Sequence, residues 1–582
     1  MVTVTGIAPG ASGVANGGEC TSGAADRTRN GSLRVAAVFS DHMVLQRETP
    51  VAVFGTAPAG GRVVVDLMDD QGVTVAQTMA VAQAYGEHET EAPWLAILPA
   101  LPASGPYTLR VSHETNRLEF ADVMIGEVWL AGGQSNMELE LHTSEHGDEA
   151  IAAADDPLLR FYNTPKAGRI DESAEAASGW EPALAPQVTG MSAIAYHFGA
   201  RLRAQLGADM AVGIIDCYIG GTSITSWMSR ATLIGSDAGR PYVERYEAAI
   251  AGKTEEQMRA EADEWQTVFD RWNNNVAAMK EAHPGITQPQ IDAEIGPCPW
   301  PPPVTPFSER RVSAPYEAMV RRVAPYTLRG FLWYQGEEDE AQCESYRELL
   351  GLLIEEWRTL WNLGGYAEPT VGYQADAGAD ALPFIVVQLP QWIDGQVAAR
   401  GEDPRHWPVI RAAQLDASET LHDVLLVCTM DCGEFDNIHP LDKTTVGTRI
   451  ADMALRGVYG RADVEAESPC VAGVTPAPGA LDVTFTNARG LHWRGTTPDT
   501  LRAAAGESGA RGAGESGFEI AGADGVYADA GARIMPGDGE RVTVRVEAPH
   551  VDSPTAVRYA WKSWGPAPLF NGAELPALPY AG

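Results

Sequence analysis

The strongest constraint on the fold is an alternation of buried-strand runs with amphipathic segments between residues 122 and 460. The runs "EVWLAGG", "VGIIDC", "FLWYQG", "PFIVVQLP" and "VLLVCTMD" are apolar at consecutive positions, as in strands that are covered on both faces. Between them, apolar residues recur every three or four positions in 191–207, 345–361 and 442–458, which is typical of helices. The alternation predicts an α/β fold with a parallel central sheet and helices on both faces. Ligands bind such sheets beyond the carboxyl ends of the strands.

Outside residues 122–460 the sequence pattern differs, and this difference predicts several domains. A single core stops growing near ~250–300 residues, and this chain has 582. We predict a flexible leader (1–32), an N-terminal β domain (33–121), a central domain (122–462) with a helical insertion at about 236–315, and a C-terminal β domain (463–582).

The insertion contains one long amphipathic helix. Its apolar stripe runs through Met258, Trp265, Phe269, Trp272 and Met279 at steps of three, four and seven. We interpret these aromatic side chains as packing residues rather than as a platform for a sugar.

Charge and cysteine content exclude several classes of function. The formal net charge of −36 argues against binding to nucleic acid or to an anionic membrane surface. No apolar run reaches the ~18 residues that would span a bilayer. The seven cysteines are scattered, which indicates reduced thiols rather than a disulfide framework. No secretion signal is visible, so we expect a cytoplasmic location. The oligomeric state is left open.

Ser135, in "GGQSNM", follows a strand and precedes a helix. It is either a nucleophile whose amide favours developing negative charge, or the N-cap of the next helix. This segment alone supports the two interpretations equally. It is not the Gly-x-Ser-x-Gly elbow of the α/β-hydrolases.

Three other strand ends carry the remaining parts that acyl transfer requires. Asp436 and His439, in "DNIHP", offer a base and the carboxylate that orients it. Gln335 offers a side-chain amide to an oxyanion, and Gly220-Gly221 expose backbone N–H groups. Each motif alone is explained better by a cap or a tight turn. Their joint placement at strand ends favours ester hydrolysis by a serine, with no metal and no cofactor.

The motifs also resemble a known family. "GEVWLAGGQSNM", "GGTSITSW", "RGFLWYQGEED" and "DNIHPLDK" are similar to the blocks of the sialate O-acetylesterase family, within the SGNH (GDSL-like) hydrolases. "VFSDHMVLQRETPVAVFG" and "AVRYAWKSW" extend the likeness over about residues 33 to 582. The resemblance implies a three-layer SGNH domain flanked by β-sandwich-type segments. It also implies that the enzyme hydrolyses O-acetyl esters on a sugar partner, typically 9-O-acetylated sialic acid.

The same resemblance implies roles for individual residues. Ser135 is the expected nucleophile, with His439 as base and Asp436 as its partner. The expected oxyanion donors are the Ser135 amide, Gly221 or its neighbour Gly220, and Gln335. Glu337, Arg411 and Trp227 also match the family and are candidates for substrate contacts. Their alternative roles are structural: a buried carboxylate for Glu337, an ion pair for Arg411 and a core position for Trp227. The chain departs from the family at Glu338-Asp339, where members often have Ser-Asn or Ser-Asp.

Other functions remain open at this point. The same chemistry on acetylated xylan or another polysaccharide is one alternative. A lipase or thioesterase on this scaffold is a second. A non-catalytic carbohydrate-binding protein is a third, and an intact set of Ser, Gly, Gln, Asp and His argues against it.

Overall fold

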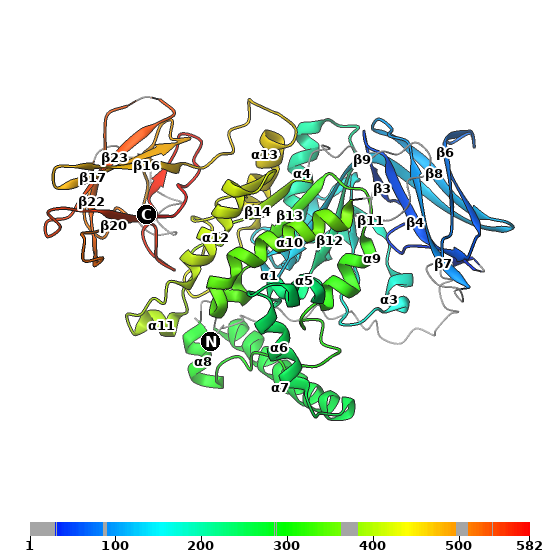
Figure 1. Cartoon of the computed structure of the whole chain (residues 1–582), viewed down its shortest axis with the longest axis horizontal. Helices are drawn as coiled ribbons and strands as arrows, with labels where there is room; N and C mark the ends of the chain where they lie inside the picture. Colours follow the sequence, from blue (N-terminus) through cyan, green and yellow to red (C-terminus); the bar gives the residue numbers. More distant parts are fainter. Residues whose placement is uncertain are drawn as a thin grey trace.

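The computed structural model describes residues 29–30, 32–84, 90–283, 286, 288–362, 382–495, 510–537 and 539–582. The predicted leader therefore lies almost wholly outside the described residues. A sheet covered by helices forms the middle of the molecule, and β-rich regions lie at its two ends (Figure 1). This arrangement confirms the predicted α/β class.

The middle of the molecule is built on an extended sheet with the strand order β11-β10-β12-β9-β13-β14-β15. Neighbours from β10 through to β15 pair in parallel, and β11 pairs antiparallel with β10. The five strand runs predicted from the sequence are β9, β12, β13, β14 and β15. The bounds are β9 Asn116–Gly133, β10 Asp155–Asn163, β11 Trp180–Leu184, β12 Val212–Tyr218, β13 Gly330–Tyr334, β14 Phe384–Val387 and β15 Val424–Val427.

Helices pack against both sides of strand β9. The ring of Trp129 meets Phe198 at 5.5 Å between centroids, whereas Gly132 packs against the ring of Trp357. Residues an odd number apart on a strand point to opposite faces. Phe198 and Trp357 belong to the predicted helices α4 and α10, and the predicted helix α13 packs on α4. Their bounds are α4 Ala193–Leu206, α10 Tyr346–Trp361 and α13 Lys443–Gly457, with α12 His406–Thr420 beside α10.

Part of the N-terminal β region is continuous with the central sheet, whereas β1, β2, β4 and β7 form a separate sheet. The first part of β9 pairs with β8 and β3, and its second part pairs with β12 and β13. The predicted boundary between residues 121 and 122 thus falls inside one strand, and one buried cluster runs from Leu33 to Ala466. The strands are β1 Arg29–Asn30, β2 Leu33–Val35, β3 Val44–Gln46, β4 Val51–Pro58, β5 Arg62–Met68, β6 Thr74–Val81, β7 Glu91–Leu98 and β8 Ser104–His113.

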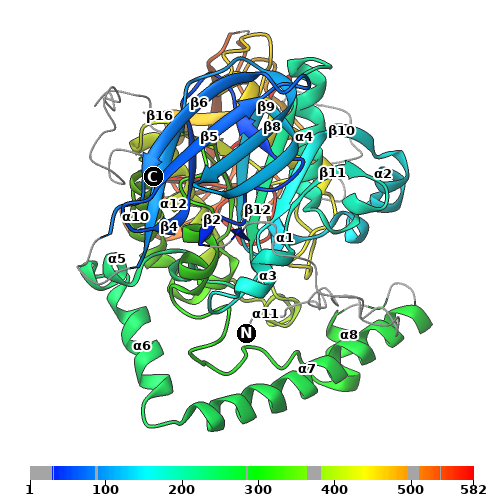
Figure 2. The same cartoon turned by 90° about the vertical axis from the view of Figure 1, so that its right-hand side faces the viewer.

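The insertion after β12 forms an arm of helices. Helices α6 and α7 extend away from the sheet, and α7 runs below the rest of the molecule in both views (Figures 1 and 2). Helix α7 contains the long stripe predicted from the sequence. A capping box at Thr254 and Gln257 fixes its start. The bounds are α5 Arg230–Gly235, α6 Arg240–Ile250, α7 Glu255–Ala282 and α8 Gln288–Ile295.

The C-terminal region has a core of its own. Leu481, Val483 and Phe485 on β17 are buried with Val544 and Val546 on β23, as their alternation predicts. Phe485 meets Tyr559 of a second sheet at 6.1 Å between ring centroids. The two sheets are β16-β17-β23-β22-β19 and β21-β20-β24-β26. The bounds are β16 Cys470–Ala477, β17 Ala480–Thr486, β19 Ala510–Arg511, β20 Phe518–Ala521, β21 Tyr527–Asp529, β22 Gly531–Ile534, β23 Val542–Glu547, β24 Ala556–Tyr559 and β26 Tyr580–Ala581.

None of the helices in the described part of the chain is long and apolar enough to cross a membrane.

Candidate functional site

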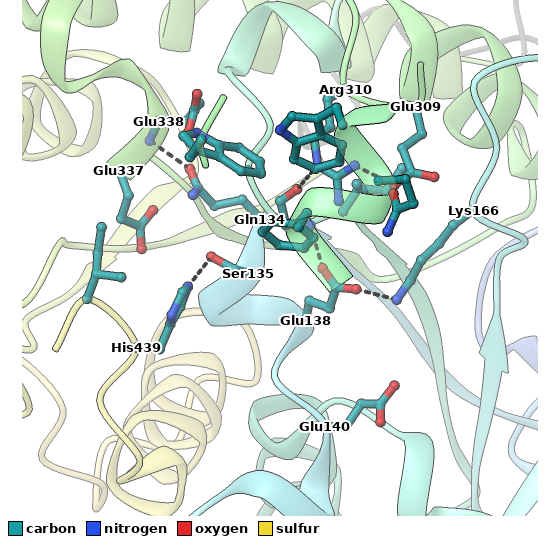
Figure 3. Close-up of a pocket in the computed structure, with 18 residues that line it drawn as sticks. Gln134, Ser135, Glu138, Glu140, Lys166, Glu309, Arg310, Glu337, Glu338 and His439 are labelled. Atoms are coloured by element: carbon teal, nitrogen blue, oxygen red, sulfur yellow. Dashed lines mark hydrogen bonds and ion pairs between the residues drawn. The ribbon is translucent and has the colours of Figure 1, made fainter. Parts of the chain in front are cut away.

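Ser135 lies at the carboxyl end of β9, at the start of the short helix α1 (Ser135–Glu138). Gly133 has φ +138°, and a Cβ there would lie 2.0 Å from the Tyr334 carbonyl oxygen, so the two strand ends approach this closely only with glycine. The Ser135 hydroxyl oxygen lies 2.7 Å from Nε2 of His439 (Figure 3). The structure therefore brings together the predicted nucleophile and the predicted base, which are 304 residues apart in the chain.

The loop between β15 and α13 holds His439 in place. Asn437 accepts a hydrogen bond from the His439 amide at 3.1 Å and donates to the His439 carbonyl at 3.0 Å. The same Asn437 amide group donates to Glu434 at 2.8 Å, and Glu434 in turn accepts from the Leu441 amide. Burial of the imidazole lowers the pKa of His439 to about 3, with smaller contributions from the charges of Lys443 and Lys280. The ring is thus a neutral acceptor at physiological pH.

Asp436 does not meet the imidazole. It has φ +59°, and its carboxylate accepts the amide of Gly395, at the start of α11 (Gly395–Ala399), at 2.6 Å. Its pKa is raised by burial and by the nearby charges of Asp394 and Asp292. The left-handed turn directs the side chain toward α11, so the predicted Asp436–His439 pair is not formed.

Gln335 lies behind the site rather than in it. Its side chain is fully buried, and its NH₂ group faces three acceptors: the Gln134 side-chain oxygen at 3.1 Å, the Thr222 carbonyl at 3.1 Å and Asp339 at 2.6 Å. The amide that the sequence offered to an oxyanion is therefore engaged in internal hydrogen bonds. The prediction failed because the acceptor Asp339, four residues further on, turns the side chain inward.

Gln134 takes the place expected for Gln335. It lines the cavity in front of Ser135, and its side-chain oxygen accepts from Gln335, from the Gly336 amide at 3.3 Å and from the Glu338 amide at 3.2 Å. With its oxygen held by these donors, the orientation of the amide is fixed, and its NH₂ group is the part left for the cavity. The sequence signal for Gln134 was its position directly before Ser135.

Gly220 and Gly221 both line the cavity. A Cβ on Gly220 would lie 3.2 Å from Cβ of Ser135, and a Cβ on Gly221, which has φ +67°, would lie 2.5 Å from the Trp300 ring. The Gly220 amide donates to the carboxylate of Glu138, which also pairs with Lys166 (Figure 3). Glu138 and Lys166 were not anticipated from the sequence.

The cavity around Ser135 and His439 has a volume of about 350 Å³. Its walls come from the strand ends and from the insertion, which contributes aromatic and charged side chains that the sequence did not indicate: Trp265, Gln266, Phe269, Trp300, Glu309 and Arg310. A cavity with apolar walls and a few polar groups, of this size, suits a small ligand.

The three candidates for substrate contact separate into two groups. Glu337 lines the cavity and accepts a hydrogen bond from the Asn136 amide at 2.6 Å. Arg411 is fully buried away from the cavity and donates to the carbonyls of Leu389, Pro390, Lys562 and Ser563. Trp227 is also fully buried, and its ring meets Trp333 at 6.1 Å. The structure thus gives Arg411 and Trp227 structural positions.

Glu338 is the departure from the family pattern, and it reaches the cavity wall. Burial raises the pKa of Glu338 to about 8, and the neighbouring charge of Asp339 adds to the shift. Asp339 is fully buried and accepts from the side chains of Ser223, Gln335 and Tyr242 and from the Ile224 amide. Asp339 therefore holds the loop after β13 against the loop after β12, whereas Glu338 lines the cavity.

Comparison with known proteins shows which enzymes this chain resembles. Residues 304–456 match the family model of the carbohydrate esterase, sialic acid-specific acetylesterase domain. The sialate O-acetylesterase of Mus musculus is 24% identical over 458 residues, which cover 75% of each chain. The human sialate O-acetylesterase is 22% identical over 468 residues, which cover 76% of this chain and 75% of the human one.

A solved structure extends the likeness to nearly the whole chain. The crystal structure of a carbohydrate acetylesterase from Xanthomonas citri superposes with a TM-score of 0.65 at 25% sequence identity, and the match covers 94% of this chain and 99% of that one. Together with the serine and histidine at the strand ends, these matches show a carboxylic ester hydrolase that is similar to the sialate O-acetylesterases.

Proposed function

We propose that this enzyme removes O-acetyl groups from a sugar through an acetyl-enzyme intermediate on Ser135. The observation that carries the proposal is the 2.7 Å contact between the Ser135 hydroxyl and Nε2 of His439 at the wall of the cavity. A serine hydroxyl becomes an effective nucleophile when an adjacent neutral imidazole accepts its proton.

The proposed reaction has two halves. The Ser135 oxygen attacks the acetyl carbonyl as His439 takes the proton, and the C–O bond to the sugar then breaks. The sugar oxygen leaves with the proton from His439, and the acetyl group stays on Ser135. Water then attacks this ester with His439 again as base, which releases acetate and restores the hydroxyl.

Hydrogen-bond donors around Ser135 support the oxyanion that forms in each half. We assign this role to the NH₂ group of Gln134 and to the backbone amides of Ser135 and Gly221. The Gly220 amide joins them when the Glu138 carboxylate gives way, because Glu138 accepts it in the present structure. Donors fixed before the reaction stabilise such charge without reorganisation.

We also assign the middle of the chain to the SGNH architecture, with β-sandwich-type regions at either end. The parallel pairing from β10 to β15, the helices on opposite faces of β9, and the nucleophile directly after β9 support this assignment. The domain boundaries remain a proposal, because β9 crosses the first of them.

Two classes of sugar follow from the relatives and the sequence. The names of the curated relatives point to an O-acetylated sialic acid, such as the 9-O-acetylated form. The alternative is acetylated xylan or another neutral polysaccharide. One of the differences between these candidates is charge, because a sialic acid carries a carboxylate and a neutral polysaccharide does not.

Acetate release from acetyl esters tests the proposal. Replacing Ser135 by Ala should lower kcat by several powers of ten, since the residues of such a set act as a unit. A fluorophosphonate should label the native enzyme at Ser135 and leave the Ser135→Ala variant unlabelled. Full activity in that variant, or a preference for long acyl chains over acetyl, would contradict the proposed function.

A further inference from the structure

One wall of the cavity is aromatic and comes from the insertion. This insertion wall consists of Trp265, Phe269 and Trp300, which line the same cavity as Ser135 and His439. The rings of Trp265 and Phe269 are stacked, with centroids 4.7 Å apart and planes at 16°. Trp300 meets Trp265 edge to face at 6.4 Å. The wall thus presents ordered aromatic surface opposite the reacting serine.

Hydrogen bonds and packing fix the orientation of the wall. The Trp265 indole N–H donates to the Pro299 carbonyl at 2.5 Å. Trp300 packs against Gly221, and the Arg310 guanidinium lies over its ring at 5.7 Å from the centroid. Arg310 also donates to the Gly220 carbonyl at 2.9 Å, so the wall is joined to the glycine loop beside Ser135.

The stripe on α7, predicted to be packing, divides into two halves. Its second half packs as predicted: Trp272 and Val276 are buried against Ile291 of α8. Of its first half, Trp265 and Phe269 line the cavity, where Trp265 remains partly exposed and Phe269 is buried, whereas Met258 is buried and does not line the cavity. Packing accounts for Met258 and the second half, which leaves the partly exposed ring of Trp265 available to a ligand.

The charges of the cavity are mostly negative. Among the described residues that line it, the carboxyl side chains are Glu138, Glu140, Glu309, Glu337 and Glu338; of these, Glu338 has a pKa raised to about 8 and is neutral at pH 7. Lys166 and Arg310 also line it, and they pair with Glu138 and with Glu309, the latter at 2.8 Å. A carboxylate on the ligand would have to displace one of these glutamates and remain close to the others. Like charges that lie close together repel strongly when they are partly shielded from water.

We propose that the insertion wall binds the ring of a neutral sugar that carries the acetyl ester, and that the surrounding glutamates disfavour a sugar with a carboxylate. The inference deepens the proposed esterase function and rests on it. The C–H faces of a sugar ring are weakly positive and match the negative face of an aromatic ring. Carboxylates such as Glu140 and Glu309 can accept hydrogen bonds from sugar hydroxyl groups.

A pair of substrates that differ only in charge tests the second half of the proposal. We compare 9-O-acetylated N-acetylneuraminic acid with its C1 methyl ester, which keeps the ring and removes the carboxylate, and follow acetate release. The proposal predicts at least about tenfold higher kcat/KM for the methyl ester. Equal or faster hydrolysis of the free acid would overturn it. No acetate release from these sugars or from 4-nitrophenyl acetate would instead contradict the esterase function.

A gain-of-function variant sharpens the charge test. Glu309→Gln releases Arg310 from its ion pair and removes one negative charge. Hydrolysis of the free acid relative to its methyl ester should rise by several-fold in Glu309→Gln. An unchanged ratio would show that the charge of the cavity does not select the substrate, and would count against the proposal.

Trp265→Ala tests the wall itself. Its KM for an acetylated neutral sugar, such as acetylated xylobiose, should rise by about tenfold. For ethyl acetate, whose small alkyl group offers no ring to the wall, the loss of kcat/KM should be at least about fivefold smaller than for the sugar ester. Val268→Ala, one turn of α7 away on the solvent side, is the matched control and should change neither. Equal effects of Trp265→Ala on both substrates, or no effect on the sugar ester, would refute the wall as a sugar site.

Discussion

The ammonium group of Lys443 donates a 2.7 Å hydrogen bond to Oδ1 of Asn136, directly beside Ser135 in the chain. Lys443 is buried, and its charge is one cause of the low pKa of His439. The charge of Glu337, which lies on the other side of Asn136, stabilises the lysine cation in turn. This network therefore adds to the larger effect of burial in keeping the imidazole neutral and able to act as a base.

The pH profile of kcat/KM should extend well into the acid range. The pKa of His439 is lowered from 6.5 to about 3, so the imidazole stays neutral and able to accept a proton down to about pH 4. Activity should be retained from pH 7 to pH 5 and fall only as pH approaches the lowered pKa. An ordinary histidine would instead lose activity just below neutrality. An acid limb, that is a fall in kcat/KM toward low pH, centred near pH 6.5 would contradict the buried environment of His439.

Removing the buried cation should move that limb. In Lys443→Met the charge that lowers the pKa of His439 is gone, so the pKa rises and the acid limb shifts to higher pH. The readout is the pH at half-maximal kcat/KM for 4-nitrophenyl acetate. Lys253→Met removes a lysine that pairs with Glu261 on the surface, and it should leave the profile unchanged. Superimposable pH profiles for Lys443→Met and wild type would show that the charge of Lys443 does not affect the pKa of His439.

The two glutamines should differ in what they contribute. Gln134→Ala removes the proposed donor to the oxyanion and should lower kcat by about 10²-fold for both aryl and sugar acetates, with little change in KM. Gln335→Ala removes a hydrogen bond to the Gln134 oxygen and one to buried Asp339, so it should lower the melting temperature more and kcat less. A large loss of kcat in Gln335→Ala together with a nearly normal kcat in Gln134→Ala would restore Gln335 as the oxyanion donor predicted from the sequence.

The sequence predicted the central sheet and the Ser135–His439 pair because both follow from local pattern. Apolar runs identify parallel strands, and polar residues at the ends of parallel strands converge at one edge of the sheet. The exchange of Gln335 for Gln134 was not predictable in this way. Both are amides at adjacent strand ends, and the position of Asp339 decides which one faces the cavity.

Two other features depend on how distant segments meet. The backbone of Asp436 turns left-handed and binds α11, which the spacing of Asp436 and His439 does not reveal. Part of the first half of the α7 stripe faces the cavity only because the chain folds back through Trp300 and Arg310 onto Gly220 and Gly221. A periodic stripe specifies which side of a helix is covered, but not by what.

Glu338 should control the alkaline side of the profile for sugar esters. Its pKa is raised to about 8, so the carboxyl group is neutral at pH 7 and becomes charged above pH 8. The KM of the wild type for an acetylated neutral sugar should therefore change between pH 7 and pH 9. Glu338→Gln resembles the neutral form and should lack this change. Lys443, whose pKa is lowered to about 8, titrates in both enzymes, so the difference between them isolates Glu338.

Arg411 should matter for stability rather than for substrate binding. Its guanidinium is fully buried and donates to four backbone carbonyls, two of which belong to Lys562 and Ser563 of the C-terminal region. Burial lowers the pKa of Arg411 only to about 10, so the group is still charged at pH 7. Arg411→Ala leaves these carbonyls without their donor, at a cost of at least about 3 kcal/mol.

The corresponding measurement is thermal unfolding, followed together with acetate release. Arg411→Ala should lower the melting temperature by roughly 5–10 °C, and its KM at 20 °C should equal that of the wild type. Arg400→Ala serves as the control, because Arg400 is exposed, pairs with Glu402 on the surface and should shift the melting temperature by less than about 2 °C. A raised KM with an unchanged melting temperature would mean that Arg411 contacts the substrate after all, since a residue that only ties the C-terminal region to the sheet cannot alter binding without altering stability.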